Sequence, residues 1–286
     1  MFVEHWIRIG PAGRRLRVGV RSGAGQGDAP VLVLLHGVTR CWRDWEPMVP
    51  HLDPGWEIHA IDHRGHGESD PADGYRVEDY ARDIVEWLGF RTGAPVVLMG
   101  HSLGAMAAAC AAAAVPGRVR VLLLEDPPFV SMGRAIEGTA WQSLFRGMRE
   151  VCLRGGTFEE RVERLGDIAV ARADGTPVAL RTLRTPEALA WGARCLMRLD
   201  SRVLEPLIEG RWMGSLDWNG IAASLRCPVV LLQGEVTAGG ALADADAEAF
   251  LNGCPEGERI RFDGQGHQLH GSIPRRIAEV VNRFLL

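Results

Sequence analysis

The sequence contains no lysine; all 32 of its basic residues are arginines. Mechanisms that need an active-site amine are therefore excluded, including Schiff-base and pyridoxal-phosphate chemistry, a P-loop lysine and a serine–lysine dyad. Tyrosine occurs only twice, as Tyr75 and Tyr80, which leaves few phenols for acid–base work. The net charge is −4 and no block of basic residues occurs. These features argue against a protein that binds nucleic acid or a membrane surface.

The six cysteines form no C-x-x-C pair, and their spacings match no zinc signature. We therefore expect neither a metal nor an organic cofactor. The start of the chain has an early glutamate and no apolar core of signal-peptide length. The longest run of small apolar residues, about Ala105 to Val115, is too short to span a bilayer. These absences predict a cytoplasmic protein with reduced thiols.

Short apolar runs alternate with helical patterns in the first and last parts of the chain. The continuous runs, which are typical of strands buried on both faces, are Val31–Leu35, Trp56–Ile61, Val96–Met99, Val119–Leu124 and Val229–Leu232. Helical patterns such as Arg76–Leu88 lie between them, and Arg259–Phe262 indicates one more strand. This alternation predicts an α/β fold with a mostly parallel sheet flanked by helices. Functional groups of such sheets lie at the carboxyl ends of the strands.

The middle of the chain has a different pattern, with no convincing buried strand. Its predicted amphipathic helices are Thr139–Leu153, Phe158–Arg172, Pro186–Leu199 and Ser201–Ile208. We interpret 131–222 as a helical cap inserted into a core made of 1–130 and 223–286. Tryptophans in this stretch pack the cap on the core or line an apolar pocket.

A G-x-S-x-G sequence, Gly100-His-Ser-Leu-Gly104, follows an apolar strand and precedes an alanine-rich helix. This strand–turn–helix context is the one that a nucleophilic serine requires, because the turn exposes its hydroxyl at the sheet edge. We therefore predict Ser102 as the nucleophile. The backbone N–H groups of Val38 and Leu103 are predicted to form an oxyanion hole.

The serine needs a base, and His267 is the first candidate among nine histidines. It follows the predicted strand at 259–262 and comes after the serine in chain order. His270 is the main rival. His36 and the polar run Asp62–Ser69 are interpreted as hydrogen-bonded turns that support the site rather than as proton carriers.

Four segments together resemble the α/β-hydrolase superfamily. They are LHGV at 35–38, DHRGHGES at 62–69, GHSLG at 100–104 and GQGH at 264–267. The resemblance covers about 31–126 and 227–286, and it implies the α/β-hydrolase sheet with a Ser-His-acid triad. Many members carry the acid in a G-x-x-D turn after the cap, where this chain has Gly234-Glu-Val-Thr237.

Two carboxylates remain open as the third member of the triad. Asp126 directly follows the fourth apolar run, where haloalkane dehalogenases and some lactone hydrolases of the superfamily place their acid. Glu235 is the alternative acid, one residue after Gly234. Glu125 is expected to face away from Asp126, because neighbouring strand residues point to opposite sides.

Serine, histidine, acid and oxyanion hole predict acyl transfer. We expect a hydrolase of esters or lactones, acting on small to medium, largely apolar substrates. A C–C bond hydrolase, a cofactor-free perhydrolase and a non-catalytic ligand receptor remain alternatives. A small-molecule ester or lactone is the expected partner.

Overall fold

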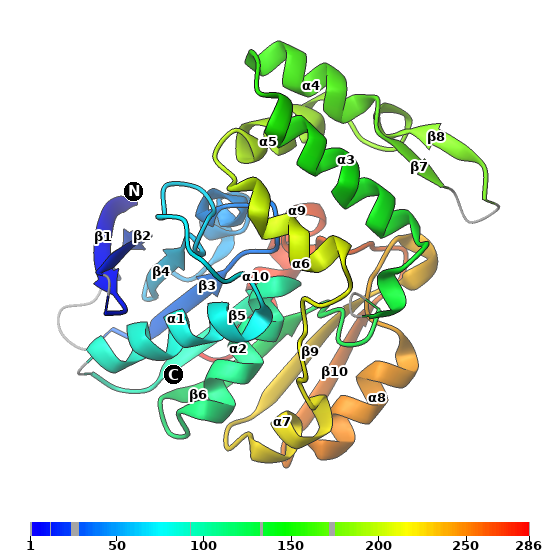
Figure 1. The fold of residues 1–286 in the computed structure, drawn as a ribbon. Helices are drawn as coiled ribbons and strands as arrows, with labels where there is room; N and C mark the ends of the chain where they lie inside the picture. The colour runs from blue at the N-terminus through cyan, green and yellow to red at the C-terminus, as the bar shows by residue number, and fades with distance from the viewer. Residues whose placement is uncertain are drawn as a thin grey trace.

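An eight-stranded sheet forms the centre of the computed structural model, which describes residues 2–11, 13–23, 29–91, 93–131, 134–171 and 175–285 (Figure 1). The strand order is β1-β2-β4-β3-β5-β6-β9-β10. The first two pairings, β1 with β2 and β2 with β4, are antiparallel, and all the others are parallel. The strands are β1 (Val3–Ile9), β2 (Arg14–Arg21), β3 (Val31–Leu35), β4 (Glu57–Ile61), β5 (Val96–His101), β6 (Val119–Glu125), β9 (Val229–Gly234) and β10 (Gly257–Phe262).

The central strands are buried on both faces, as their continuous apolar sequences indicate. In β3, Val31, Val33 and Leu35 pack in the core on one side of the sheet. Leu32 and Leu34 pack in the core on the other side. This alternation follows from the two-residue period of a strand. The prediction of a mostly parallel sheet flanked by helices is confirmed.

Helices cover both faces of the sheet. The first core contains buried residues of α1 (Val77–Phe90), α2 (Leu103–Ala114), α7 (Trp218–Ser224) and α8 (Asp244–Gly253). The second contains α9 (Leu269–Ser272), α10 (Pro274–Asn282) and the 3-10 helix η1 (Trp42–Trp45). The remaining 3-10 turns are η2 (Val49–His51), η3 (Arg134–Ile136), η4 (Leu180–Thr182), η5 (Ser201–Leu204) and η6 (Val236–Ala238).

Residues 140–208, which we call the helical layer, lie across one end of the sheet (Figure 1). The layer contains α3 (Ala140–Arg154), α4 (Phe158–Gly166), α5 (Pro186–Leu196) and α6 (Glu205–Ile208). It also contains a small hairpin of β7 (Ala169–Ala171) and β8 (Pro177–Ala179). The helix expected over 158–172 is therefore too long. The capping box of Thr157 and Glu160 starts α4, which ends at Gly166 before the hairpin begins. The 131–222 cap boundaries stay a prediction.

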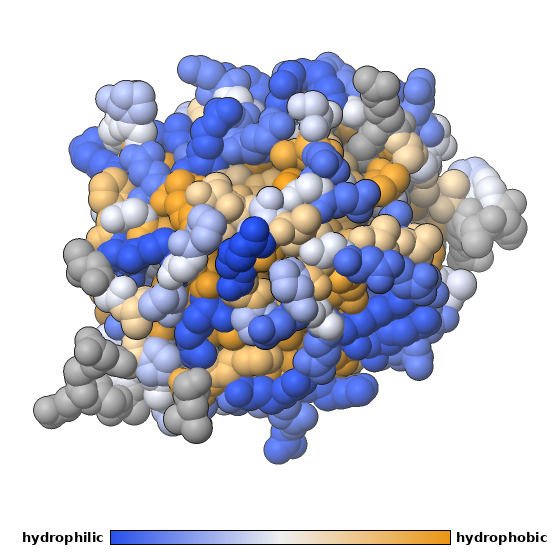
Figure 2. All heavy atoms as spheres, turned by 90° about the horizontal axis from the view of Figure 1, so that it is seen from below, coloured by the Kyte–Doolittle hydropathy of each residue, from blue (hydrophilic) through white to orange (hydrophobic). Residues whose placement is uncertain are grey.

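The sequence pattern did not indicate the hairpin of β1 and β2. Its strands lie at the sheet edge, and most residues of β1 are at least partly exposed. Their short alternating pattern differs from the continuous apolar runs of the buried strands. On the face seen from below, hydrophilic and hydrophobic residues are interspersed (Figure 2). No helix in the described ranges combines the length and the apolar character that crossing a bilayer requires.

Close contact between α2 and β3 depends on Gly104. A Cβ at this position would lie 2.1 Å from the carbonyl oxygen of Leu35. We expect Gly104→Ala to lower the free energy of unfolding by about 1–3 kcal/mol, because two backbones must move apart. Thermal or urea unfolding measures this loss. Gly89→Ala in α1 is the matched control. A Cβ at this position would meet no atom from outside its own turn of helix within 4 Å, so the free energy of unfolding should stay equal or rise. Equal stability of Gly104→Ala and the wild type would contradict the close packing.

Candidate active site

Ser102 lies in a strained turn between β5 and α2. Its backbone has φ 52° and ψ −114°, outside the regions that a serine ordinarily adopts. Its N–H donates to the carbonyl oxygen of Glu125 at 2.9 Å, which fixes the turn to the end of β6. A Cβ at Gly100 would lie 2.2 Å from the carbonyl oxygen of Gly104, so only glycine fits there. The turn therefore has the features of a nucleophile elbow.

The loop after β3 packs directly against this turn. A Cβ at Gly37 would lie 3.4 Å from the Cβ of Ser102 and 2.7 Å from Nδ1 of His101. The chain then reverses at Thr39, which has φ 65°. Leu103 begins α2, so its N–H is among the first-turn donors that lack a partner inside a helix. Val38 follows Gly37, so the two residues predicted for the oxyanion hole lie on segments that meet beside Ser102.

His267 contacts the fully buried carboxylate of Asp126. Its Nδ1 lies 2.6 Å from Oδ2 of Asp126 and donates its proton there. The same carboxylate accepts backbone N–H groups from Gly234 at 3.2 Å and Ala241 at 2.7 Å. These hydrogen bonds hold the carboxylate of Asp126 in place beside the imidazole. The arrangement also fixes the tautomer of His267, leaving its Nε2 free of this proton.

His267 is held next to the turn that carries Ser102. Nε2 of His101, the residue before Ser102, donates to the carbonyl oxygen of His267 at 2.9 Å. The two imidazole rings have centroids 4.6 Å apart. From the helical layer, the ring of Trp141 lies 5.7 Å from that of His267. Ser102, His267 and Asp126 are thus brought to one place by β5, β6 and the loop after β10.

Glu235, the alternative acid, lies elsewhere. Its carboxylate accepts the N–H of Gly264 at 2.7 Å and the hydroxyl of Thr237. These two hydrogen bonds, that of Thr237 first, lower the pKa of Glu235. Its own N–H donates to the carbonyl oxygen of Gln265 at 2.7 Å. Glu235 therefore shapes the loop that carries His267, and Asp126 contacts the imidazole.

His270, the rival base, is committed to two other carboxylates. Its Nδ1 lies 2.8 Å from Oε1 of Glu125, and its Nε2 lies 3.2 Å from Oδ2 of Asp44. Burial alone would lower the pKa of His270, but the charges of Glu125 and Asp44 and their hydrogen bonds raise it to about 9. His270 is therefore a buried imidazolium with both N–H groups in use. As expected, Glu125 faces away from the pair formed by Asp126 and His267.

Asp44 joins this network to the helical layer, and no motif indicated it. Its Oδ1 accepts the indole N–H of Trp191 at 2.8 Å, and its Oδ2 accepts the amide of Gln268 at 2.7 Å. Although burial alone would raise the pKa of Asp44, the charge of Arg40 and the hydrogen bond of His270 lower it. In the sequence, only the neighbouring Trp42 and Trp45 mark the position of Asp44 as part of a packed segment.

Asp44, His101 and His270 also form a cluster whose ligand atoms lie within 4.8 Å of one another. A metal would need a lone pair from each imidazole. Both nitrogens of His270 instead carry protons that they donate to carboxylates. The chemistry of this cluster is therefore that of a hydrogen-bonded ion network.

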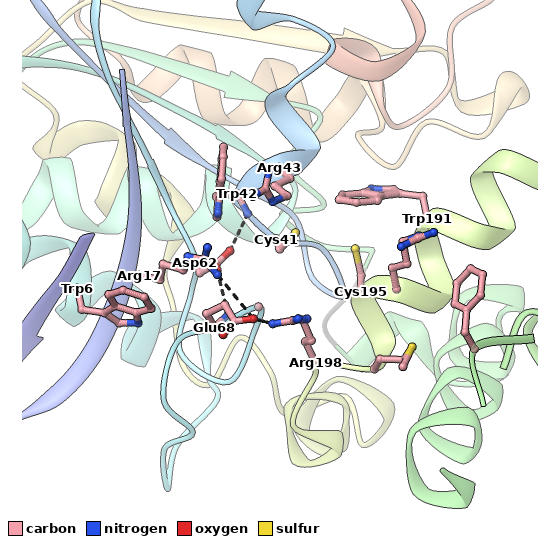
Figure 3. A pocket seen from close by; sticks show the side chains of 14 residues that line it. Trp6, Arg17, Cys41, Trp42, Arg43, Asp62, Glu68, Trp191, Cys195 and Arg198 are labelled. Atoms are coloured by element: carbon pink, nitrogen blue, oxygen red, sulfur yellow. Dashed lines mark hydrogen bonds and ion pairs between the residues drawn. The ribbon is translucent and has the colours of Figure 1, made fainter. Parts of the chain in front are cut away.

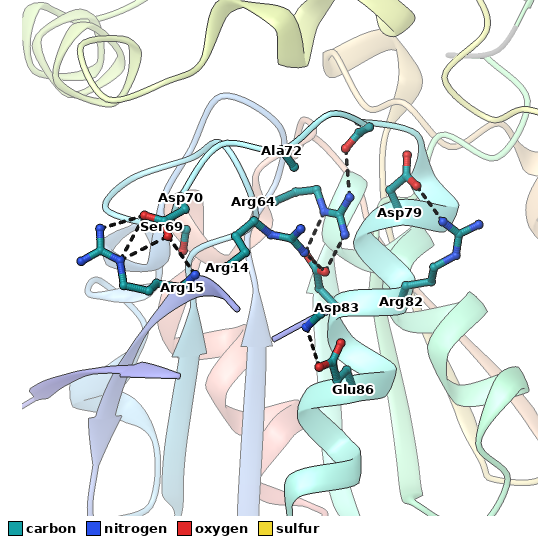
Figure 4. Close-up of polar contacts among 12 residues, drawn as sticks. Arg14, Arg15, Arg64, Ser69, Asp70, Ala72, Asp79, Arg82, Asp83 and Glu86 are labelled. Carbon is teal, nitrogen blue, oxygen red and sulfur yellow. Dashed lines mark hydrogen bonds and ion pairs between the residues drawn. The ribbon is translucent and has the colours of Figure 1, made fainter. Parts of the chain in front are cut away.

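The polar run 62–69 forms a hydrogen-bonded turn. The guanidinium of Arg64 binds Asp83 of α1, with Nε 2.7 Å from Oδ2 (Figure 4). The hydroxyl of Ser69 donates to the carbonyl oxygen of Asp62 at 2.7 Å. Burial, followed by nearby histidines, lowers the pKa of His36 well below its usual value, so His36 stays neutral. This geometry agrees with the interpretation of His36 and the turn as support for the site.

A cavity of about 630 Å³ lies beside the loop after β3, between the sheet and the helical layer (Figure 3). Its lining includes Cys41 from this loop, Trp42 and Arg43 from η1, and Trp191 and Cys195 from α5. The guanidinium of Arg43 lies 4.5 Å from the ring centroid of Trp42. Neither Ser102 nor His267 lines this cavity.

The buried ion network predicts an unusual titration of His270. Because the pKa of His270 is raised in the folded state, protonated His270 contributes fully to the stability of the folded protein below about pH 6.5. That contribution is lost as the pH rises through the folded-state pKa of about 9. NMR of histidine-labelled protein should therefore show the His270 ring still protonated at about pH 8. Comparison with His270→Gln assigns the signal. A ring that loses its proton below pH 7 would contradict this network.

The comparisons with known proteins agree with this fold. Residues 30–157 match the family model described as the alpha/beta hydrolase fold. Among curated proteins, 2-(acetamidomethylene)succinate hydrolase of Mesorhizobium japonicum is 34% identical over 131 residues, which cover 45% of each chain. The matched region thus spans less than half of that relative. A pimeloyl-(acyl-carrier protein) methyl ester esterase of Xanthomonas axonopodis is 27% identical over 91% of this chain and 96% of its own.

Solved structures resemble the chain over nearly its whole length. The structure of E-2-(acetamidomethylene)succinate hydrolase has a TM-score of 0.74 at 22% identity, covering 99% of both chains. An enol-lactonase from Burkholderia xenovorans has a TM-score of 0.69 at 20% identity, covering 96% of this chain and 97% of its own. With the sheet order described above, these matches show that the chain has the α/β-hydrolase fold.

Proposed function

We propose that this chain is a serine hydrolase that cleaves carboxylic esters or lactones of small to medium, largely apolar substrates. The observation that carries the proposal is the contact of His267 with the buried Asp126, next to the strained turn of Ser102. The names of similar proteins support the class, since they include a methyl ester esterase and an enol-lactonase.

The mechanism follows from the hydrogen-bond directions. Because Nδ1 of His267 donates to Asp126, its Nε2 acts as the base that takes the proton of the Ser102 hydroxyl. The serine oxygen attacks the substrate carbonyl. The developing oxyanion is stabilised by the N–H groups of Val38 and Leu103, aided by the positive end of α2. His267 then protonates the leaving group, and water releases the acyl enzyme by the same steps.

The helical layer acts as the cap in this proposal. Trp141 of α3 lies against the His267 ring, and Trp191 of α5 binds Asp44 of the core. The indole of Trp141 thus borders the reaction site from this layer. A pocket closed in this way takes a substrate that is small to medium in size rather than a large polymer.

The assignment of Asp126 as the triad acid is tested by two amide variants. Asp126→Asn should lower kcat by about 10⁴-fold, because the imidazole loses the acceptor that orients it. Glu235→Gln, directly after the neighbouring strand β9, is the matched control, and its kcat should stay much closer to that of the wild type. Steady-state hydrolysis of a p-nitrophenyl ester measures both. The assignment is wrong if Glu235→Gln shows the large loss and Asp126→Asn does not.

The reaction class is tested with p-nitrophenyl esters from acetate to decanoate. We expect turnover by the wild type and none by Ser102→Ala, whose circular dichroism should remain that of the folded protein. The chain-length optimum then gives the size of the pocket. Ester hydrolysis retained by Ser102→Ala would refute the proposed mechanism.

A phosphonate probe for active serines distinguishes the enzyme from a ligand receptor on the same fold. Rapid labelling at Ser102, found by peptide mass spectrometry, supports the enzyme. Absence of labelling in the folded protein would support the receptor. Labelling without ester turnover would direct the substrate search to C–C bond hydrolysis or perhydrolysis.

A further inference from the structure

One face of α5 meets the loop after β3. Trp191 and Cys195 are four residues apart on α5, so they lie on the same side of the helix, one turn from each other. The indole N–H of Trp191 donates to Asp44 at 2.8 Å, which sets the position of α5 against the loop. Cys41 is the N-cap residue of η1, three positions before Asp44. The contact at Trp191 therefore places Cys195 opposite Cys41.

The two thiols meet at the wall of the cavity described above. Cys41 and Cys195 both line it, one from the core and one from the helical layer (Figure 3). Their side chains lie next to each other, the interaction with Cys195 raises the pKa of the Cys41 thiol, and both cysteines are free thiols in the structure. The cavity of about 630 Å³ gives small solutes access to this pair. Neither sulfur has a role in the proposed hydrolysis.

We propose that Cys41 and Cys195 are a redox-responsive pair, which hydrogen peroxide converts into a disulfide that joins α5 to the loop after β3. The oxidant comes from solution and is a hydroperoxide small enough to enter the cavity. Thiols from a common reductant return the pair to its free form by exchange.

The electrons for this step come from the two thiols. The Cys195 sulfur attacks one peroxide oxygen, the O–O bond breaks, and the released hydroxide takes the thiol proton to form water. Cys41 then attacks the resulting sulfenic acid, the S–O bond breaks, and a second water leaves with the Cys41 proton. Two thiols and one peroxide thus give one disulfide and two waters.

The order of attack follows from the surroundings of Cys41. The hydrogen bond to Cys195, together with burial, raises the pKa of Cys41, so Cys41 keeps its proton while its partner is a thiol. Thiolates are the reactive form, so Cys41 attacks only after its interaction with the Cys195 thiol is lost. Oxidation of Cys195 removes that thiol hydrogen bond and thereby makes Cys41 easier to ionise.

The disulfide would restrict the helical layer. The layer carries Trp141 against the His267 ring, and the loop after β3 carries Gly37 against Ser102. A covalent bond between them resists any movement of the layer that admits a bulky acyl chain. This consequence rests on the proposed function, whereas formation of the disulfide does not.

Peptide mass spectrometry tests the pair directly. Because the chain has no lysine, trypsin cuts only after arginine and releases Cys41–Arg43 and Cys195–Arg198 as separate short peptides. After treatment of the whole protein with hydrogen peroxide, we expect one linked species, two hydrogen masses below the sum of both peptides. Dithiothreitol should split it. Recovery of the two peptides as unlinked thiols, or as separate sulfinic acids, would overturn the proposal.

Thermal unfolding and three serine variants provide the second readout. Oxidation should raise the unfolding midpoint of the wild type by several degrees, because the bond closes a long loop in the unfolded chain. The matched control Cys254→Ser should show the same reversible rise. Cys41→Ser and Cys195→Ser should show none. A rise that persists in either of these two variants would contradict the assignment.

Ester hydrolysis separates this inference from the proposed function. Oxidation should lower the hydrolysis of p-nitrophenyl decanoate several-fold in the wild type and in Cys254→Ser, and dithiothreitol should restore it. Cys41→Ser should be insensitive to the treatment. Unchanged hydrolysis by the linked form would refute the restriction of the layer. A linked peptide in a protein without any hydrolase activity would refute the proposed function and support the redox pair.

Discussion

The fully buried carboxylate of Asp126 is the constraint on which the rest of the site depends. A buried charge is costly unless it is paired and hydrogen-bonded. Here the N–H groups of Gly234 and Ala241 and the ring of His267 supply the partners. These donors come from the end of β9, from the segment between η6 and α8, and from the loop after β10. The positive φ of Asp126 directs its carboxylate to them. One side chain therefore connects three segments that are distant in the sequence.

Glu125, the last residue of β6 and the neighbour of Asp126, organises the other side of this edge. It binds His270, and His270 in turn binds Asp44. Two adjacent carboxylates thus hold His267 of the loop after β10 and His270 of α9, because consecutive residues at the end of a strand point in opposite directions. Asp44 extends the network to Trp191 of α5. The position of the loop that carries His267 is therefore coupled to the docking of the helical layer on the core.

Several parts of this arrangement were predictable because their causes are local. Continuous apolar runs indicated the central strands, and two glycines around Ser102 indicated a turn that admits no side chain. The edge hairpin of β1 and β2 lacked such runs, and α4 ended earlier than its pattern suggested. Both differences arise where a segment is half exposed, because burial there depends on its neighbours rather than on its own sequence.

The sequence by itself determined the type of sheet, the strained turn of Ser102 and the histidine loop, because periodicity and glycine act over a few residues. It left Asp126 and Glu235 open as partners of His267. Only the tertiary structure decided between them. The carboxylate of Glu235 accepts the N–H of Gly264, whereas the carboxylate of Asp126 accepts the N–H of the His267 ring. The contacts of Asp44 with His270 and Trp191 were equally invisible in the sequence, since they join residues more than 140 positions apart. Such pairings depend on how the strands and the helical layer pack.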